Sequence, residues 1–355
     1  MPTTPSLYDL DAMQLADLLD GQPRYRLDQV WQGLYKHSLF PDEISNVPKA
    51  LRETLIQRAP MALTEVTKSV SDKGDTTKWL WRLTDGSVVE TVLMLYPDRA
   101  TVCVSTQAGC AMACGFCATG QAGFERNLTA GEIVEQLMRA QRAAEGRRVS
   151  NIVYMGMGEP MANFDRMWAS VNKIHGDVGI SARHLTISTV GIIPGIKRLT
   201  EESLPVNLAV SLHAANDTLR DELVPINKRY PLDDLAAACA EYVKVTRRRL
   251  SLEWALIADT NDRDSDAREL ADYARSLGAH INLIPLNPTP GYPVMGTPPQ
   301  RVNRFVTLLT DMGANATVRR TRGTEIDAAC GQLAAGRPTN TLVPITISRA
   351  ARQDQ

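Results

Sequence analysis

The sequence lacks long hydrophobic runs and contains little cysteine. No stretch approaches the roughly 18 consecutive apolar residues that suggest a membrane-spanning helix, so no such helix is expected. Six cysteines in 355 residues is a low density for a secreted scaffold held by disulfides. No signal-peptide pattern is visible at the N-terminus. These absences predict a protein of the reducing cytoplasm.

The chain also lacks an excess of either charge. It has 39 lysine and arginine residues against 40 aspartate and glutamate residues, a formal net charge of −1. Any binding of nucleic acid must therefore come from local basic patches. Candidates are Arg24 with Arg26, the run 247–249, and the group Arg319, Arg320 and Arg322. A single basic run is more often a solvated face than a binding site.

Three of the six cysteines stand together as Cys110, Cys114 and Cys117, with the spacing C-x3-C-x2-C. Three thiolates can hold a [4Fe–4S] cluster by three of its irons and leave the fourth iron open for chemistry. A structural zinc site is the alternative, but it needs a fourth ligand and commonly shows paired C-x2-C motifs. The spacing resembles that of the radical S-adenosylmethionine (SAM) enzymes, in which SAM occupies the open iron.

The other three cysteines differ in their surroundings. Cys239 lies in an alanine-rich helical pattern and is expected to be a buried core residue. Cys103 has apolar neighbours, and the pattern alone favours the same interpretation. Cys330 is flanked by glycine and polar residues, which indicates a loop where a thiol can react. Glu90, in Val89-Glu-Thr-Val, taken alone resembles an exposed strand carboxylate.

The hydrophobic periodicity predicts an α/β protein with a partial (β/α)6 barrel, preceded by a small helical domain and a short β extension. Residues 1–60 are expected to be an RNA-binding helical domain, 61–100 a β-hairpin extension around Asp85-Gly86, 101–335 the barrel, and 336–355 a tail. Barrel strands are predicted at 101–106, 150–155, 184–189, 206–211, 250–257, 280–286 and 315–319. Helices are predicted between them, for example from Ala130 after a Thr129/Glu132 capping box.

Candidate ligand-binding residues follow several of these strands, where a barrel gathers its functional groups. The residues are Gly158 and Glu159 in Gly156-Met-Gly-Glu-Pro160, then Ser188, then Ser211, Leu212 and His213, and finally Asn287. Each alone is more often a turn residue or a cap. After a cluster-binding loop, the set predicts a SAM site, in which Glu159 binds the amino group of the ligand.

Longer segments make a family resemblance specific. They are Cys103-Val-Ser-Thr-Gln-Ala-Gly-Cys-Ala-Met-Ala-Cys-Gly-Phe-Cys117, Gly156-Met-Gly-Glu-Pro160, Ser211-Leu-His-Ala214, Val224-Pro-Ile-Asn-Lys228, and Arg320-Thr-Arg-Gly323 followed by Ile326-Asp-Ala-Ala-Cys-Gly-Gln-Leu333. From about residue 25 to 335 the chain resembles the RlmN family of radical SAM RNA methyltransferases. The resemblance implies methylation of C2 of an adenine, at position 2503 of 23S rRNA and position 37 of certain tRNAs.

The resemblance also implies roles for residues. Cys330 would receive a methyl group from one SAM molecule, and a second SAM molecule would be cleaved to the radical that activates that methyl group. The carbon radical adds to C2, which is too electron-poor to attack SAM itself. Glu90 would then remove the C2 proton, and Cys103 would release the product by forming a disulfide with Cys330.

The partners implied are 23S rRNA and tRNA, an electron donor such as flavodoxin or ferredoxin, and a thiol reductant that resets the disulfide; the chain is expected to be a monomer. Arg319, Arg320 and Arg322 are candidate phosphate contacts. Two alternatives remain open: a Cfr-like enzyme that methylates C8 of the same rRNA base, and an RNA-binding protein with zinc or a cluster but without catalysis.

Overall fold

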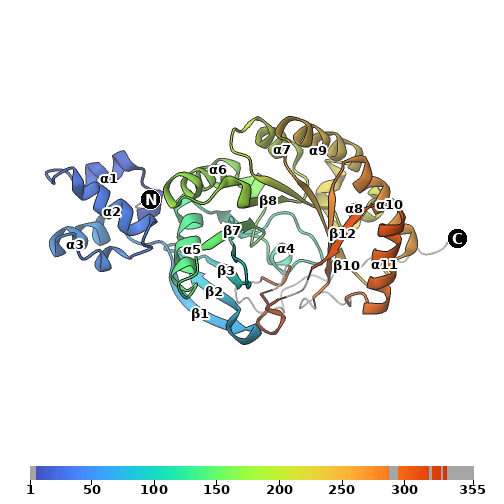
Figure 1. The fold of residues 1–355 in the computed structure, drawn as a ribbon, viewed down its shortest axis with the longest axis horizontal. Coiled ribbons are helices and arrows are strands. Elements are labelled where there is room, and N and C mark those ends of the chain that lie inside the picture. Colours follow the sequence, from blue (N-terminus) through green and yellow to red (C-terminus); the bar gives the residue numbers. More distant parts are fainter. Residues whose placement is uncertain (1–4, 288–294, 320–321, 329–330, 334–355) are drawn as a thin grey trace. The chain divides into compact units, whose positions relative to one another are not determined.

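The computed structural model describes residues 5–287, 295–319, 322–328 and 331–333 (Figure 1). The chain forms two compact units. Unit 1 contains residues 1–108 and 125–186, and unit 2 contains residues 109–124 and 187–355. In the described part of the chain, no helix has both the length and the apolar character needed to cross a membrane.

Unit 1 begins with three helices, which Figure 1 shows in blue: α1 (Ala12–Leu18), α2 (Tyr25–Tyr35) and α3 (Lys49–Arg58). The Asp11 carboxylate accepts a hydrogen bond from the Gln14 N–H at 2.8 Å, and Pro48 precedes the first turn of α3. The apolar face of α2 is buried through Val30, Leu34 and Tyr35.

The sheet of unit 1 has five strands: β1 (Thr64–Ser71), β2 (Thr76–Arg82), β3 (Val88–Leu95), β4 (Ala100–Cys103) and β7 (Val149–Tyr154). The first four pair antiparallel in sequence order, and β7 pairs with β4 in parallel. The hairpin predicted at Asp85-Gly86 is confirmed, because the Leu83 N–H donates to the Ser87 carbonyl at 2.8 Å.

One predicted strand boundary was wrong. The strand expected over 101–106 ends at Cys103, and Gln107–Gly109 forms β5, which pairs with β6 (Phe124–Asn127) in a separate small sheet. A side-chain amide explains the break, since the Ser105 N–H donates to Gln136 Oε1 at 2.8 Å instead of continuing the ladder. Gln136 lies on α5 (Ala130–Arg142), which begins at the predicted capping box, and α6 (Phe164–Lys173) follows β7.

Strand β8 (Leu185–Thr189) crosses the boundary between the units. Unit 2 continues with β9 (Asn207–Ser211), β10 (Leu250–Leu256), β11 (His280–Pro285) and β12 (Asn315–Val318), in which each strand pairs with the next in parallel. This confirms the predicted strand–helix alternation. Within unit 2, the carboxyl ends of these strands therefore share one edge.

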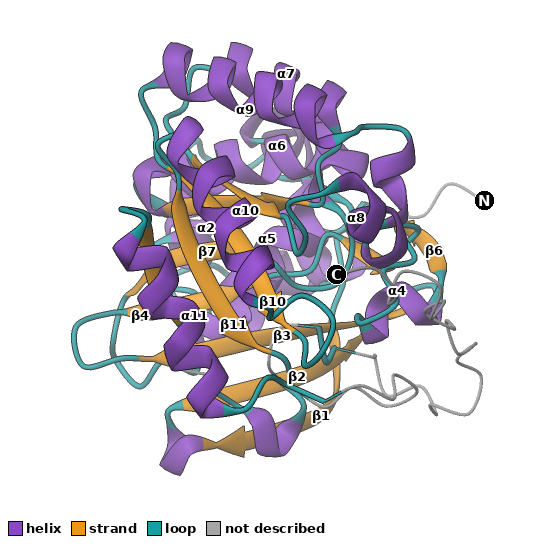
Figure 2. Ribbon diagram, turned by 90° about the vertical axis from the view of Figure 1, so that its right-hand side faces the viewer, coloured by secondary structure: helices purple, strands orange, loops and turns teal. Residues whose placement is uncertain are grey.

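The helices of unit 2 are α4 (Ala118–Ala122), α7 (Ile193–Glu201), α8 (Asp217–Leu223), α9 (Leu232–Thr246), α10 (Asp264–Ser276) and α11 (Pro299–Asp311). Figure 2 shows α7 and α9 side by side. Cys239 lies on α9 and is 1% exposed, which confirms it as a core residue. Burial raises the pKa of its thiol to about 12, so this cysteine is chemically inert at neutral pH.

Candidate active site

The three clustered cysteines lie in a loop of unit 2 between β5 and α4. The base of the loop is closed, because the Cys110 N–H donates to the Gly123 carbonyl at 2.9 Å. Gly109 has φ +72°, and a Cβ at this position would collide with the same carbonyl. Further along, the Cys117 N–H donates to the Cys114 carbonyl at 3.1 Å. These bonds fix the main chain of the short loop that carries the three thiols.

The donor chemistry of the loop fits an iron–sulfur cluster. Cys114 is buried, and Cys110 and Cys117 are partly buried. Burial raises the pKa of the Cys117 thiol, although amides of Gly120 and Thr119 oppose the rise. Binding of iron would therefore release a proton. Among the described residues, no three Cys, His, Asp or Glu side chains converge as a preformed metal site. The fit thus rests on the presence of three thiols in one short loop.

The loop packs directly against the predicted SAM residue His213 of unit 2. The Phe116 and His213 rings meet edge to face, with centroids 4.7 Å apart. The Ala255 N–H donates to His213 Nδ1 at 3.0 Å, and burial lowers the pKa of this imidazole to about 3. His213 is therefore neutral and carries its proton on Nε2, so it can donate one hydrogen bond to a ligand.

The main chain at His213 is fixed by a residue that the sequence analysis missed. Arg220 is fully buried, and its guanidinium donates to the carbonyls of Leu212, Ser211 and Val190 at 3.1, 3.3 and 2.7 Å. It also donates to Asn227 Oδ1 at 2.7 Å. The motif Val224-Pro-Ile-Asn-Lys228 gave the only signal, since it supplies this partner. Arg220 thus fixes the main-chain conformation of the loop that follows β9.

Two further predicted residues are buried in unit 2. Ser188 on β8 is 8% exposed and Asn287, after β11, is 7% exposed. Ser211 is half-buried at the end of β9, and Leu212 is fully buried. The carboxyl ends of β8, β9 and β11 therefore carry the members of the predicted set that belong to unit 2.

The end of the described chain lies on the cysteine loop. The Ala118 N–H, next to Cys117, donates to the Gly331 carbonyl at 2.8 Å, and Thr119 Oγ1 donates to the Leu333 carbonyl at 2.5 Å. Both bonds lie within unit 2. Cys330 and Arg320 themselves lie outside the described residues.

The residues that flank Arg320 have different surroundings. The Arg319 N–H donates to the Leu283 carbonyl at 2.8 Å, which extends the pairing of β12 with β11. Burial raises the pKa of Glu253 on β10, and the charge of Arg319 opposes that rise. Arg322 is half-buried. Part of the charge of Arg319 is thus directed at a buried carboxylate of its own unit.

Glu90 and Cys103 belong to unit 1. The pattern-based interpretation of Glu90 as an exposed carboxylate was wrong, because the residue is 3% exposed. It lies on β3, with Oε1 3.4 Å from Lys78 Nζ on β2. The ammonium stabilises negative charge on this carboxylate. Cys103 is half-buried at the end of β4, where it pairs with Val153 of β7 and Val92 of β3.

The glycines at 156 and 158 are explained by packing inside unit 1. A Cβ on Gly158, which has φ +96°, would lie 2.5 Å from Gln107 Cβ, and one on Gly156 would lie 2.7 Å from the Val104 carbonyl carbon. The next residue, Glu159, is buried, and its Oε1 accepts a hydrogen bond from the Met161 N–H at 2.9 Å. The need for glycine thus arises from the protein itself, and contact with SAM stays a prediction.

Comparisons with known proteins agree with this arrangement. Residues 104–277 match the radical SAM superfamily. A probable dual-specificity RNA methyltransferase RlmN from Chloroflexus aurantiacus is 48% identical, over 95% of this chain and 95% of the relative. Another so named, from Roseiflexus sp., is 43% identical over 95% of this chain and 98% of the relative. The crystal structure of a radical SAM methyltransferase from Sphaerobacter thermophilus is 49% identical, with a TM-score of 0.90 over 93% of this chain and 99% of that one.

The fold and the cysteine loop define a radical SAM protein, whose superfamily uses a [4Fe–4S] cluster and SAM. The predicted partial barrel, with its mixed and largely parallel sheet, is confirmed at this level. Within that class, the chain belongs to the RlmN family.

Proposed function

We propose that this chain methylates C2 of adenine in RNA, at position 2503 of 23S rRNA and position 37 of tRNAs. Its relatives in the RlmN family are named dual-specificity RNA methyltransferases. The observation that carries the proposal is the bond from Ala118 to Gly331, the residue after Cys330. It connects the segment of the candidate methyl carrier to the cysteine loop.

Cys110, Cys114 and Cys117 would hold one [4Fe–4S] cluster per chain. SAM would contact Gly158 and Glu159, together with Ser188, Ser211, Leu212, His213 and Asn287. When bound, the cluster and SAM supply the radical chemistry that C2 of adenine requires. Within unit 2, His213 offers a fixed neutral donor, and Arg220 keeps its loop in place by hydrogen bonds to three carbonyls.

Cys330 would carry the methyl group as S-methylcysteine and then bond to adenine C2. Covalent capture by a protein thiol divides one difficult transfer into two easier steps. Glu90 would take the C2 proton, and Cys103 would attack the sulfur of Cys330 to free the methylated base. The resulting disulfide requires a thiol reductant, and the cluster requires an electron donor such as flavodoxin or ferredoxin.

Glu90→Gln should lower the methylation rate by about 10² to 10⁴-fold, because a neutral amide cannot accept the C2 proton. RNA binding should change little. Single-turnover methyl transfer and RNA affinity would be measured on the same preparation. Glu65→Gln, a change at an exposed carboxylate on β1, is the matched control. If Glu90→Gln methylates as fast as the control, Glu90 is not the base.

The substrates would be recognised mainly through their backbones, with the target adenine turned out of its stack. Arg319, Arg320 and Arg322 are candidate phosphate contacts, and residues 1–60 a candidate RNA-binding region. We further propose that the enzyme acts as a cytoplasmic monomer.

The position of the new methyl group tests the proposed reaction. The chain would be reconstituted without oxygen and supplied with SAM, a reductant and RNA, and the digested nucleosides would be resolved by mass spectrometry. The account requires 2-methyladenosine. A product methylated at C8 would instead favour the Cfr-like alternative. Absence of both products under conditions that cleave SAM would refute the assignment.

A further inference from the structure

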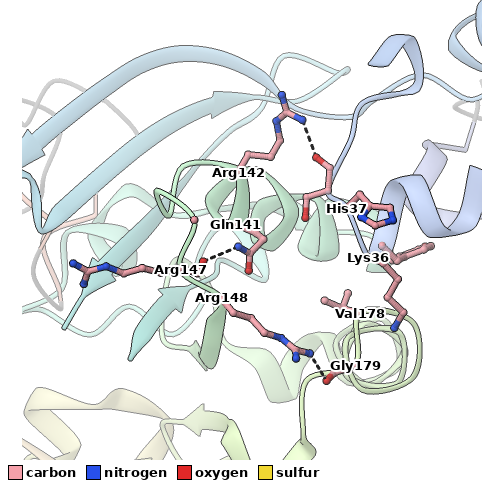
Figure 3. Close-up of a pocket in the computed structure, with 11 residues that line it drawn as sticks. Lys36, His37, Gln141, Arg142, Arg147, Arg148, Val178 and Gly179 are labelled. Atoms are coloured by element: carbon pink, nitrogen blue, oxygen red, sulfur yellow. Dashed lines mark hydrogen bonds between the residues drawn. The ribbon is translucent and has the colours of Figure 1, made fainter. Parts of the chain in front are cut away.

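A basic pocket of about 900 Å3 lies in unit 1, and none of its lining residues has been given a chemical role above (Figure 3). It is bounded by the end of α2, the turn between α5 and β7, and the end of the π-helical turn Ile174–Val178. Its lining consists of Tyr35, Lys36, His37, Ser38, Gln141, Arg142, Gly146, Arg147, Arg148, Val178 and Gly179. These residues include four permanent cations and one histidine but no aspartate or glutamate, so the wall favours an anion.

Two of the cations converge on one point. Lys36 Nζ and Arg148 Nη2 lie 3.3 and 3.6 Å from the position that a Cβ on Gly179 would occupy. Figure 3 shows Arg148 extended toward Gly179 and Lys36 reaching the helix end beside Val178. Gly179 has φ +86°, which favours glycine, and the absence of a side chain keeps the space between the two cations open.

Both cations retain donors for a ligand. Lys36 Nζ donates to the Asp177 carbonyl at 2.6 Å, and Arg148 Nη2 donates to the Gly179 carbonyl at 2.9 Å. A lysine ammonium has three N–H donors and an arginine guanidinium five. Within the described residues, neither cation forms an ion pair with a carboxylate. Their charge is therefore not neutralised by direct contact.

The neighbouring charged groups are arranged differently. Arg142 is held by Glu43 at 2.6 Å, and Arg147 donates to the Tyr96 carbonyl at 3.0 Å, away from Arg148 in Figure 3. The charges of Asp177 and Asp9 both act on the Tyr35 phenol. Burial raises the pKa of the Asp177 carboxyl, although Lys173 and Lys36 oppose the rise. Lys36 and Arg148 thus provide the positive charge that faces the pocket.

Tyr35, which also lines the pocket, carries a buried hydroxyl. Tyr35 is 2% exposed, and its hydroxyl has no hydrogen-bond partner among the described residues. Burial raises the pKa of this phenol, so the group stays protonated and can donate. A buried polar group without a partner is costly, and an anionic oxygen in the pocket would relieve that cost.

We propose that this pocket binds a backbone phosphate of the RNA substrate outside the reacting nucleotide, clamped between Lys36 and Arg148 with Tyr35 as a further donor. The inference rests on the proposed RNA methyltransferase function. Phosphate contacts carry no sequence information. They suit an enzyme whose two substrates, rRNA and tRNA, share a backbone but not an overall structure. The pocket gives the proposed RNA-binding role of residues 1–60 a specific site.

The test is RNA affinity as a function of salt. An unmodified tRNA transcript with adenine at position 37 would be titrated with the full chain. Lys36→Glu/Arg148→Glu should weaken binding about tenfold and reduce the salt slope by roughly 0.7 to 0.9 for each phosphate that the protein no longer neutralises. Lys244→Glu/Arg268→Glu is the matched control, since it changes the net charge equally at exposed helix positions outside the pocket. It should leave both quantities nearly unchanged.

Two milder variants keep the test valid if charge reversal disturbs folding. Lys36→Gln/Arg148→Gln should shift binding in the same direction by a smaller factor. Tyr35→Phe should weaken RNA binding about fivefold without loss of thermal stability, because it removes a donor that has no partner among the described residues. Equal losses in the pocket variants and the matched control would overturn the proposal, as would unchanged binding in the pocket variants.

Two further measurements complete the test. The first distinguishes RNA phosphate from small-molecule phosphate, and the second separates this inference from the proposed function. Inorganic phosphate and AMP at millimolar concentration should compete only weakly with RNA. If either binds tightly and RNA affinity is independent of the pocket, a small-molecule site replaces the one proposed. If RNA binding depends on the pocket but the wild-type enzyme forms no methyladenosine, the proposed function fails and this inference stands.

Discussion

Replacing Cys330 by alanine is expected to lower RNA methylation by at least about 10³-fold, because no other thiol takes over the methyl group. SAM cleavage should persist, since the proposed cluster ligands Cys110, Cys114 and Cys117 are unchanged in this variant. This one variant would therefore lose RNA methylation and keep SAM cleavage. Methylated nucleoside and 5′-deoxyadenosine would be quantified together, and labelled SAM would show whether the protein itself becomes methylated.

Cys239→Ala is the matched control for this experiment. Cys239 is buried on α9, and burial raises the pKa of its thiol to about 12, so its loss should affect neither activity. Methylated RNA at the wild-type rate from Cys330→Ala would remove Cys330 from the pathway. A simultaneous loss of SAM cleavage would mean that this residue supports the cluster rather than the methyl group.

Replacing Cys103 by alanine should trap the enzyme on its RNA. Without the resolving thiol, the bond between Cys330 and adenine has no route to cleavage, so a covalent adduct accumulates as product formation falls. The adduct would appear as a slowly migrating band in a denaturing gel, and nuclease would convert it to a band near the free protein. The expected yield approaches one RNA per active chain.

The Cys103 prediction has its own internal check. Cys103→Ala/Cys330→Ala should form no adduct, because the carrier thiol is missing as well. An adduct in this double variant would place the link on another residue. Free turnover of Cys103→Ala would show that product release needs no disulfide.

Sequence patterns predicted the elements of the fold well because the patterns are local. The Thr129/Glu132 capping box, the Asp85-Gly86 turn and the parallel strands of unit 2 are all present. The strand after residue 100 was predicted too long, because a long-range bond from Gln136 ends it. A partner 31 positions away leaves no local trace.

The site prediction rests on sequence motifs more than on physical patterns. The environment of Glu90 was wrong when judged from pattern alone, because its burial depends on the sheet around it and on Lys78 across the hairpin. The structural role of Arg220 was missed, since a single arginine within a helix pattern usually faces solvent. The spacing of Cys110, Cys114 and Cys117, by contrast, can be recognised in the sequence because the ligands of a cluster can lie within one short segment.

Metal analysis of the anaerobically reconstituted protein tests the central claim most directly. The account predicts about four irons per chain with a broad visible absorption band that SAM alters, and loss of both in Cys114→Ala. Zinc bound at the cysteine loop, with no iron and no response to SAM, would contradict it.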